Sequence, residues 1–184
     1  MRAIANKLKI LFLLSLAALF CACSDDEKRV MVDGSLEPPH PNFWKNTFSM
    51  KGVDSNKDGV RDDVERWINR KFPGDEKYNL RNLYKQEARS FGFMLDEANS
   101  SELIEHYWKS NVNASQCAVD IYNSSAAMIY FGEVSSEVQT KIFNMPWRIF
   151  RRKKNESKLS GKVLGMDKIY NKYSTCDFEV KNVF

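Results

Sequence analysis

Residues 75–98 read DEKYNLRNLYKQEARSFGFMLDEA, and this stretch decides the class of fold. Its apolar side chains recur every three or four positions, which is the spacing of one face of an α-helix. Pro73 and Gly74 stop the segment before it, and Asp75 is placed to cap the new helix. The stretch therefore predicts an amphipathic helix whose buried stripe is Leu80, Tyr84, Ala88, Phe91, Leu95 and Ala98.

Helical spacing of apolar residues continues on both sides of this stretch, and the alternation typical of strands is largely absent. Residues 43–184 are therefore predicted to form one all-α domain, a small helical bundle with an irregular C-terminal tail after the turn at 159–161. We expect its other helices over residues 61–72, from 100 or 101 to 132, from 135 or 136 to a point before Pro146, over 147–158 and over 166–173.

Immediately before this bundle, residues 54–65 read DSNKDGVRDDVE. Oxygen-bearing side chains stand at loop positions 1, 3, 5, 9 and 12, and Gly59 stands at position 6, which is the layout of an EF-hand calcium loop. Calcium takes six to eight oxygen ligands, so a short loop must direct several of them to one point. The predicted ligands are the side chains of Asp54, Asn56, Asp58, Asp62 and Glu65 and the backbone carbonyl of Val60.

The loop is solitary, because no second sequence of this kind occurs in the chain. Position 8, usually aliphatic in paired EF-hands, is Arg61, and Gly52 makes the preceding residues a poor helix. We expect a loop-then-helix site similar to the calcium loops of dockerin and thrombospondin-type repeats, structural in role and binding at roughly 10⁻⁴–10⁻³ M. The alternative is an Asp- and Asn-rich turn that only caps the helix after it.

The N-terminus has the pattern of an export signal. Arg2, Lys7 and Lys9 precede an apolar run over 10–22 that is too short to span a membrane. The run ends in FCACS, which resembles the lipobox of bacterial lipoproteins and predicts a signal peptide over 1–22 and acylation of Cys23. By analogy with those lipoproteins, Ser24 instead of Asp after the cysteine implies the outer membrane, with the domain facing the periplasm. A plain signal peptide cut near Ala22 is the alternative.

Charge and composition point away from nucleic acid. Residues 1–23 hold three of the 28 basic residues and none of the 24 acidic ones, which leaves 25 basic against 24 acidic after cleavage. A nearly neutral domain has no basic footprint for nucleic acid. Residues 23–42 are polar and then rich in proline, which predicts a lipidated N-terminus followed by a disordered tether.

Cys117 and Cys176 are the two cysteines of the predicted domain. An exported chain meets an oxidising compartment, so we expect them to form a disulfide that closes a loop of about 60 residues and stabilises the fold by about 4 kcal/mol. A catalytic thiol is the weaker alternative, because His106 lies about three turns earlier on the same predicted helix.

A basic run follows Trp147: Arg148, Arg151, Arg152, Lys153 and Lys154. It is interpreted as a solvated helix face; the alternative is a surface that binds anionic lipid head groups or lipopolysaccharide phosphates. The chain has no Gly-rich phosphate loop, no Gly-x-Ser-x-Gly elbow and no His-Glu-x-x-His zinc helix, so no catalytic residue is predicted.

The run from Asp54 to Arg66 resembles a signature of uncharacterised proteobacterial lipoproteins. Phe143-Asn144, Arg148, Leu159-Ser160-Gly161 and Cys176-Asp177-Phe178 are similar to the C-terminal part of that family, while Met145-Pro146 departs from its Thr-containing pattern. The resemblance implies an envelope location and calcium, and no activity.

The sequence thus predicts a non-enzymatic, calcium-binding lipoprotein of the bacterial envelope. Its expected partners are the membrane, through the N-terminal lipid, and an envelope protein or polymer. An envelope enzyme or inhibitor with an unrecognised helical active site remains the alternative, beside the anionic-surface module.

Overall fold

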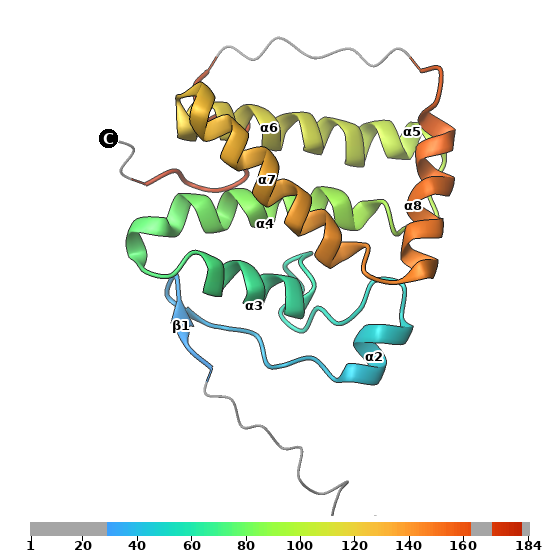
Figure 1. Cartoon of the computed structure of the whole chain (residues 1–184), viewed down its shortest axis with the longest axis horizontal. Coiled ribbons are helices and arrows are strands. Elements are labelled where there is room, and N and C mark those ends of the chain that lie inside the picture. Colours follow the sequence, from blue (N-terminus) through green and yellow to red (C-terminus); the bar gives the residue numbers. More distant parts are fainter. Residues whose placement is uncertain (1–28, 163–170, 182–184) are drawn as a thin grey trace, which may run out of the picture.

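The computed structural model describes residues 29–162 and 171–181 and confirms the predicted all-α class (Figure 1). The predicted signal peptide, Cys23 and most of the helix expected over 166–173 lie outside these residues. In the described part, six helical units pack together beside one small hairpin. The elements are β1 (Met31–Val32), β2 (Ser35–Leu36), α2 (Phe43–Phe48), α3 (Asp62–Lys71), η1 (Asp75–Lys77), α4 (Tyr78–Phe93), α5 (Ser100–Glu102), η2 (Leu103–Trp108), α6 (Lys109–Tyr122), α7 (Ser125–Ile142) and α8 (Pro146–Leu159).

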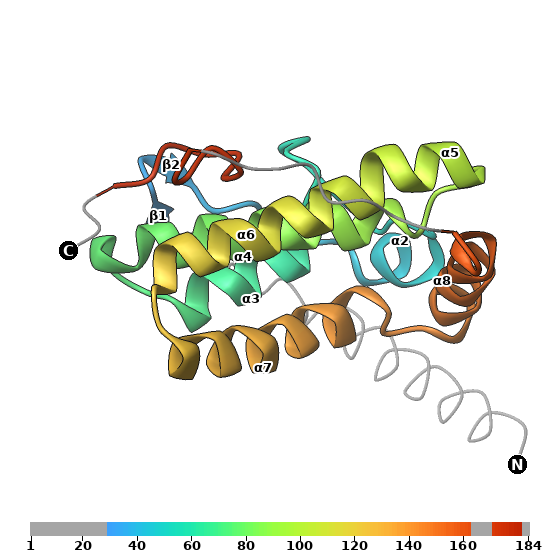
Figure 2. The same cartoon turned by 90° about the horizontal axis from the view of Figure 1, so that it is seen from above.

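Helix α4 is the centre of the bundle and packs against α3, α6 and α7. The predicted stripe is buried from Tyr84 to Ala98, although α4 ends at Phe93 so that Leu95 and Ala98 lie beyond the helix, and Leu80 packs partly buried against the same core. The Tyr84 ring stacks between Phe72 and Phe131, with centroid separations of 5.0 and 5.8 Å. Figure 2 shows α7 on one side of the α4–α6 pair and the C-terminal segment on the other. The stacked aromatic rings thus join α4 to the end of α3 and to α7 in the apolar core.

Between α5 and α8, the helices begin and end at residues other than those predicted from the sequence. The long helix ends at Tyr122, not at Gly132, because Asn123 takes a left-handed conformation (φ 47°) that closes it. Ser124 then caps α7 by accepting a hydrogen bond from the amide of Ala127. Gly132 lies inside α7, and the separate helix expected from 135 or 136 is the second half of α7.

The segment predicted to be a disordered tether is partly ordered. Residues 31–36 form the hairpin β1–β2, and two buried arginines hold it to the bundle. Arg81 of α4 binds the carboxylate of Asp33, while Arg66 of α3 pairs with Glu37 at 2.9 Å. Because both guanidinium groups are buried, each attaches this N-terminal segment firmly to a helix of the core.

The prediction that Arg148 belongs to an exposed basic surface is wrong. Its side chain is fully buried, and it donates hydrogen bonds to the backbone carbonyls of Asn46, Ser49 and Met50 at 2.5, 2.9 and 3.0 Å. Burial lowers the pKa of Arg148 to about 10, with the positive charge of Arg61 a smaller cause. The group stays charged at neutral pH and ties α2 to α8 across about a hundred residues of sequence.

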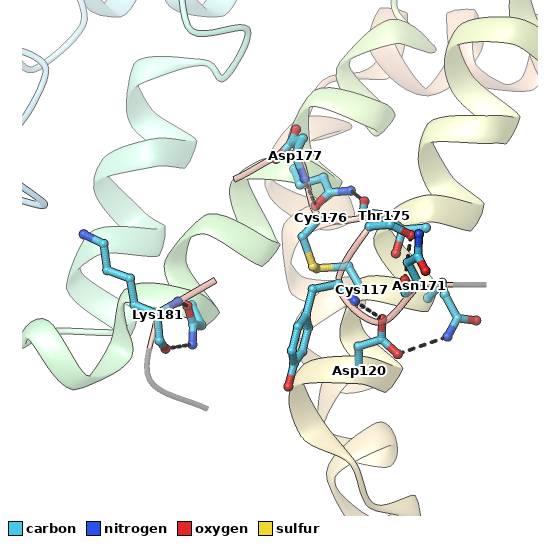
Figure 3. Close-up of a disulfide and its surroundings, with 12 residues drawn as sticks. Cys117, Asp120, Asn171, Thr175, Cys176, Asp177 and Lys181 are labelled. Atoms are coloured by element: carbon cyan, nitrogen blue, oxygen red, sulfur yellow. Dashed lines mark hydrogen bonds between the residues drawn. A yellow bond between two sulfur atoms is a disulfide. The ribbon is translucent and has the colours of Figure 1, made fainter. Parts of the chain in front are cut away.

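The predicted disulfide is present: Cys117 of α6 bonds to Cys176, with their Cα atoms 5.0 Å apart (Figure 3). The tail is also bound by side-chain amides of α4. Gln86 donates to the carbonyl of Thr175 at 2.7 Å and accepts from the amide of Asp177 at 3.2 Å. Residues 171–181, the part of the tail that the structure describes, are therefore fixed across the bundle without forming a helix or strand.

Within the described ranges, each helix falls short of the length and apolarity that crossing a membrane requires.

Candidate metal centre

The predicted calcium loop is a turn that delivers the chain into α3. Gly59 has a φ of +86°, a conformation in which residues with a Cβ are strained, and Lys57 also adopts a positive φ of 59°. The amide of Asp62 donates to the carbonyl of Val53 at 2.8 Å, which brings the two ends of the loop together. Helix α3 then begins at Asp62, so the last two predicted ligand positions stand on its first turn.

Backbone amides of the loop hold the predicted ligand side chains over the turn. The amide of Gly59 donates to Asp54 Oδ2 at 3.0 Å, and that of Ser55 donates to Asp62 Oδ1 at 2.8 Å. The amide of Val60 likewise donates to Asp58 Oδ1 at 2.8 Å. These bonds fix the orientation of three carboxylates before any ion arrives.

Two carboxylate oxygens of this loop are buried without a hydrogen-bond partner: Asp54 Oδ1 and Asp62 Oδ2. A buried carboxylate oxygen without a partner is costly, so each of these two atoms would gain from a positive charge placed beside it. Burial raises the pKa of Asp62, and the negative charges of Asp54 and Asp58 raise it further. The electrostatics therefore favour uptake of positive charge at this position.

Glu65, at loop position 12, accepts its hydrogen bonds from side chains and not from backbone amides of the loop. Lys85 of α4 donates to Glu65 Oε1 at 2.7 Å, and the Asn56 amide donates to Oε2 at 3.1 Å. Burial raises the pKa of Glu65, while Lys85 acts in the opposite direction. Among the residues that the structure describes, no three His, Cys, Asp or Glu side chains converge as a metal cluster. The predicted carboxylates are therefore not gathered round one point in this structure, and a calcium ion would have to draw them together and compete with Lys85 for Glu65.

The unusual residue at position 8 has a structural role. Arg61 is buried and donates to the carbonyls of Lys141 and Ile142 at 2.6 and 3.3 Å, which satisfies the C-terminal end of α7. Gly52 (φ +79°) is required beside it, because a Cβ there would lie 2.0 Å from the Arg61 side chain. The loop is therefore anchored to α7 instead of pairing with a sister loop.

A cavity of about 270 Å³ lies beside the loop, lined by residues that include Asp54, Gly59 and Arg61. Three basic groups that line it are in ion pairs: Lys51 with Asp96 at 2.5 Å, Arg61 with Asp63 at 2.5 Å, and Arg89 with Asp177 at 2.7 Å; Asp54 is a predicted calcium ligand. The cavity thus presents an apolar wall between ion pairs and adds no group to the predicted ligands.

The remainder of the basic run is only partly available to a ligand. Arg151 pairs with Glu97 at 2.9 Å, and Arg152 pairs with Glu156 at 2.6 Å. Lys153 and Lys154 are exposed on α8. The five basic residues therefore do not form one cationic face.

A scan against protein-family models, a search of curated proteins and a search of solved structures each find no match. The resemblance to proteobacterial lipoproteins accordingly stays a prediction.

Sequence reasoning missed Lys85 as a partner of the loop. The signal was present, because Lys85 stands one residue after the buried Tyr84 and three before the buried Ala88, on the apolar stripe of α4. A lysine at such a position needs a buried acid as partner, and Glu65 is that acid.

Proposed function

We propose that this protein is an exported, lipid-anchored envelope protein whose helical domain is stabilised by one calcium ion at the 54–65 loop, and that it acts by binding and not by catalysis. The observation that carries the calcium assignment is the pair of buried oxygens, Asp54 Oδ1 and Asp62 Oδ2, that have no hydrogen-bond partner. Asn56, Asp58, Glu65 and the carbonyl of Val60 would complete the oxygen set.

The ion would supply charge compensation and no chemistry. Asp62 stands on the first turn of α3, and Asp54 stands at the entry of the loop. A cation shared by their carboxylates would join the two ends of the turn and fix the direction in which the chain enters the bundle. This role suits the solitary, weak sites of extracellular modules.

Two observations support the location. The Cys117–Cys176 disulfide indicates an oxidising compartment outside the cytoplasm. The lipobox-like sequence at Cys23 supports a lipid anchor in the envelope, on the outer membrane and facing the periplasm. An envelope enzyme or inhibitor is the alternative; its site would have to use groups other than the paired charges beside the loop.

Calcium calorimetry on the full chain, purified in detergent, tests the proposal. We expect one site with a Kd of roughly 0.1–1 mM, and in 10 mM calcium a stabilisation of about 1.4–2.7 kcal/mol relative to chelator. Asp58→Ala should abolish both effects, while Asp75→Ala, an exposed acid of η1, should retain them. A thermal shift that persists in Asp58→Ala would place the ion elsewhere.

A further inference from the structure

Exposed apolar side chains concentrate where the described chain begins. Eleven large apolar residues are exposed in the part of the chain that the structure describes, and six of them fall within residues 30–48. They are Val30, Met31, Leu36, Phe43, Trp44 and Phe48. Such a concentration in one short segment indicates an interaction surface, whereas exposed apolar residues scattered singly need no explanation.

The centre of this surface is a series of aromatic rings on α2 and α8. Trp44 packs edge-on against Phe43 at 5.4 Å and stacks on Phe48 at 5.6 Å, and Phe48 stacks on Trp147 at 6.0 Å. Phe150, 70 % exposed, lies one turn after Trp147 on the same face of α8. We call Phe43, Trp44, Phe48, Trp147 and Phe150 the aromatic patch.

Helix α2 presents these rings without burying any of its own residues. Phe43, Trp44 and Phe48 are 63–66 % exposed, so the helix contributes nothing to the apolar core. It is nevertheless fixed, because the buried Arg148 binds the carbonyl of Asn46 within it and that of Ser49 at its end. A rigid helix that carries three exposed rings and no core residue is built to contact something outside the domain.

The position of the chain entry indicates what that partner is. Figure 1 places β1, next to the start of the described chain, and α2 on the same lower side of the molecule. Arg29 stands six positions after Cys23 in the sequence, and six residue steps reach at most about 20 Å. A lipid on Cys23 would therefore hold this side close to the bilayer. Basic side chains flank the patch, with Lys45 on α2 and Lys153 and Lys154 on α8 all exposed.

We propose that the aromatic patch docks on the phospholipid bilayer that carries the lipid anchor. Tryptophan and phenylalanine rings favour the boundary between head groups and acyl chains, and neighbouring lysines favour lipid phosphates. The inference rests on the proposed anchor at Cys23 and adds an orientation, with α2 against the membrane.

The test uses the full processed chain mixed with phosphatidylcholine–phosphatidylglycerol vesicles, with or without bromine on the acyl chains close to the head groups. Flotation with the vesicles shows whether the lipid anchor attaches the chain to the bilayer. Quenching of tryptophan fluorescence by bromine shows whether the aromatic patch contacts the acyl chains. We expect the chain to float and its emission to be quenched. Trp44→Ser with Phe48→Ser should still float and lose most of the quenching, whereas Ile129→Ser, an equally exposed site on α7, should keep both.

The two readouts separate the two proposals. A chain that floats without bromine quenching overturns the docking surface and leaves the anchor, and points to a protein as the partner of the patch. A chain that is quenched but does not float supports the patch and overturns the anchor. Equal quenching in the wild type and in the Trp44–Phe48 variant overturns the docking of α2 against the membrane, since the signal would then come from tryptophans other than Trp44.

Discussion

The Nζ atom of Lys85 lies 2.7 Å from Oε1 of Glu65, inside the bundle and at the closing position of the predicted calcium loop. Both side chains are largely buried, so each charge depends on the other. In the absence of calcium, the ammonium group supplies the positive charge that the loop needs at this position. Calcium and Lys85 would thus bind to the same carboxylate.

Replacing Lys85 with Met should strengthen calcium binding. With no ammonium to displace, Glu65 is free to close the loop, so the calcium Kd should fall. In chelator the variant should lose about 3 kcal/mol of unfolding free energy, because a buried carboxylate loses its partner. Calorimetry gives the Kd, and chemical unfolding in calcium and in chelator gives the stability difference, which should widen.

Lys71→Met is the matched control for this prediction. Lys71 pairs with Glu137 on the surface, at 2.8 Å, and its removal deletes the same charge away from the loop. Its calcium affinity should equal that of the wild type. A Lys85→Met variant that binds calcium more weakly than the wild type would show that the ion does not use Glu65.

The buried carboxyl group of Glu87 should make the folded protein less stable as the pH rises. Burial raises the pKa of Glu87 from its ordinary 4.5 to about 7, although the Ser135 hydroxyl donates to its Oε1. Its Oε2 is buried without a hydrogen-bond partner. The folded state therefore keeps a proton that the unfolded state releases between pH 4.5 and 7. The contribution of Glu87 to the unfolding free energy is therefore fully present below pH 4.5 and is lost as the pH rises to 7.

Glu87→Gln removes that titration while keeping the shape of the side chain. The variant should match the wild type near pH 4.5 and exceed its unfolding free energy by about 3 kcal/mol at pH 8. Urea unfolding at the two pH values measures the difference, with the exposed Glu133→Gln as reference. A Glu87→Gln variant no more stable than the wild type at pH 8 contradicts the buried, protonated carboxyl.

The sequence predicted the features that depend on local spacing. The apolar stripe of α4 and the pairing of Cys117 with Cys176 are both found in the structure. Periodicity identifies a buried helix face, and two cysteines in one exported domain leave one pairing. The break at Asn123 was missed because helical spacing of apolar residues continues across it, and Asn is only the second choice for a left-handed cap.

What the sequence did not predict are buried charges whose partners lie far away along the chain. Arg148 reads as part of a basic run, yet its partners are carbonyls of residues 46–50. Arg61 reads as a departure from a loop pattern, yet it binds the end of α7. An amphipathic pattern cannot distinguish such residues from solvated ones, because it contains no information about which backbone carbonyls come within reach after folding.

Removing the disulfide should cost about 4 kcal/mol, because a cross-link 59 residues apart no longer restricts the unfolded chain. The variant Cys117→Ala with Cys176→Ala should show this loss and should not respond to dithiothreitol, which destabilises the wild type by the same amount. Gln86→Ala, which removes the amide bonds to the tail, should stay sensitive to reductant. Two free thiols in the non-reduced, purified wild type would refute the linkage.

Arg148→Met should detach α2 from α8 and weaken the whole fold. The guanidinium group satisfies carbonyls of Asn46, Ser49 and Met50, and hydrogen bonds to a charged group contribute about 1.5–3 kcal/mol each. We expect a loss of at least about 2 kcal/mol of unfolding free energy, with hydrogen exchange accelerated in residues 43–51 more than in α4.

Two further variants control for the loss of charge. Lys154→Met removes an exposed cation on the same helix and should change neither measurement. Arg148→Lys keeps the charge but lacks the planar fork that reaches several carbonyls at once, so it should fall between the two. Equal exchange rates in α2 of the wild type and Arg148→Met would mean that stacking of Phe48 on Trp147 alone holds the helix in place.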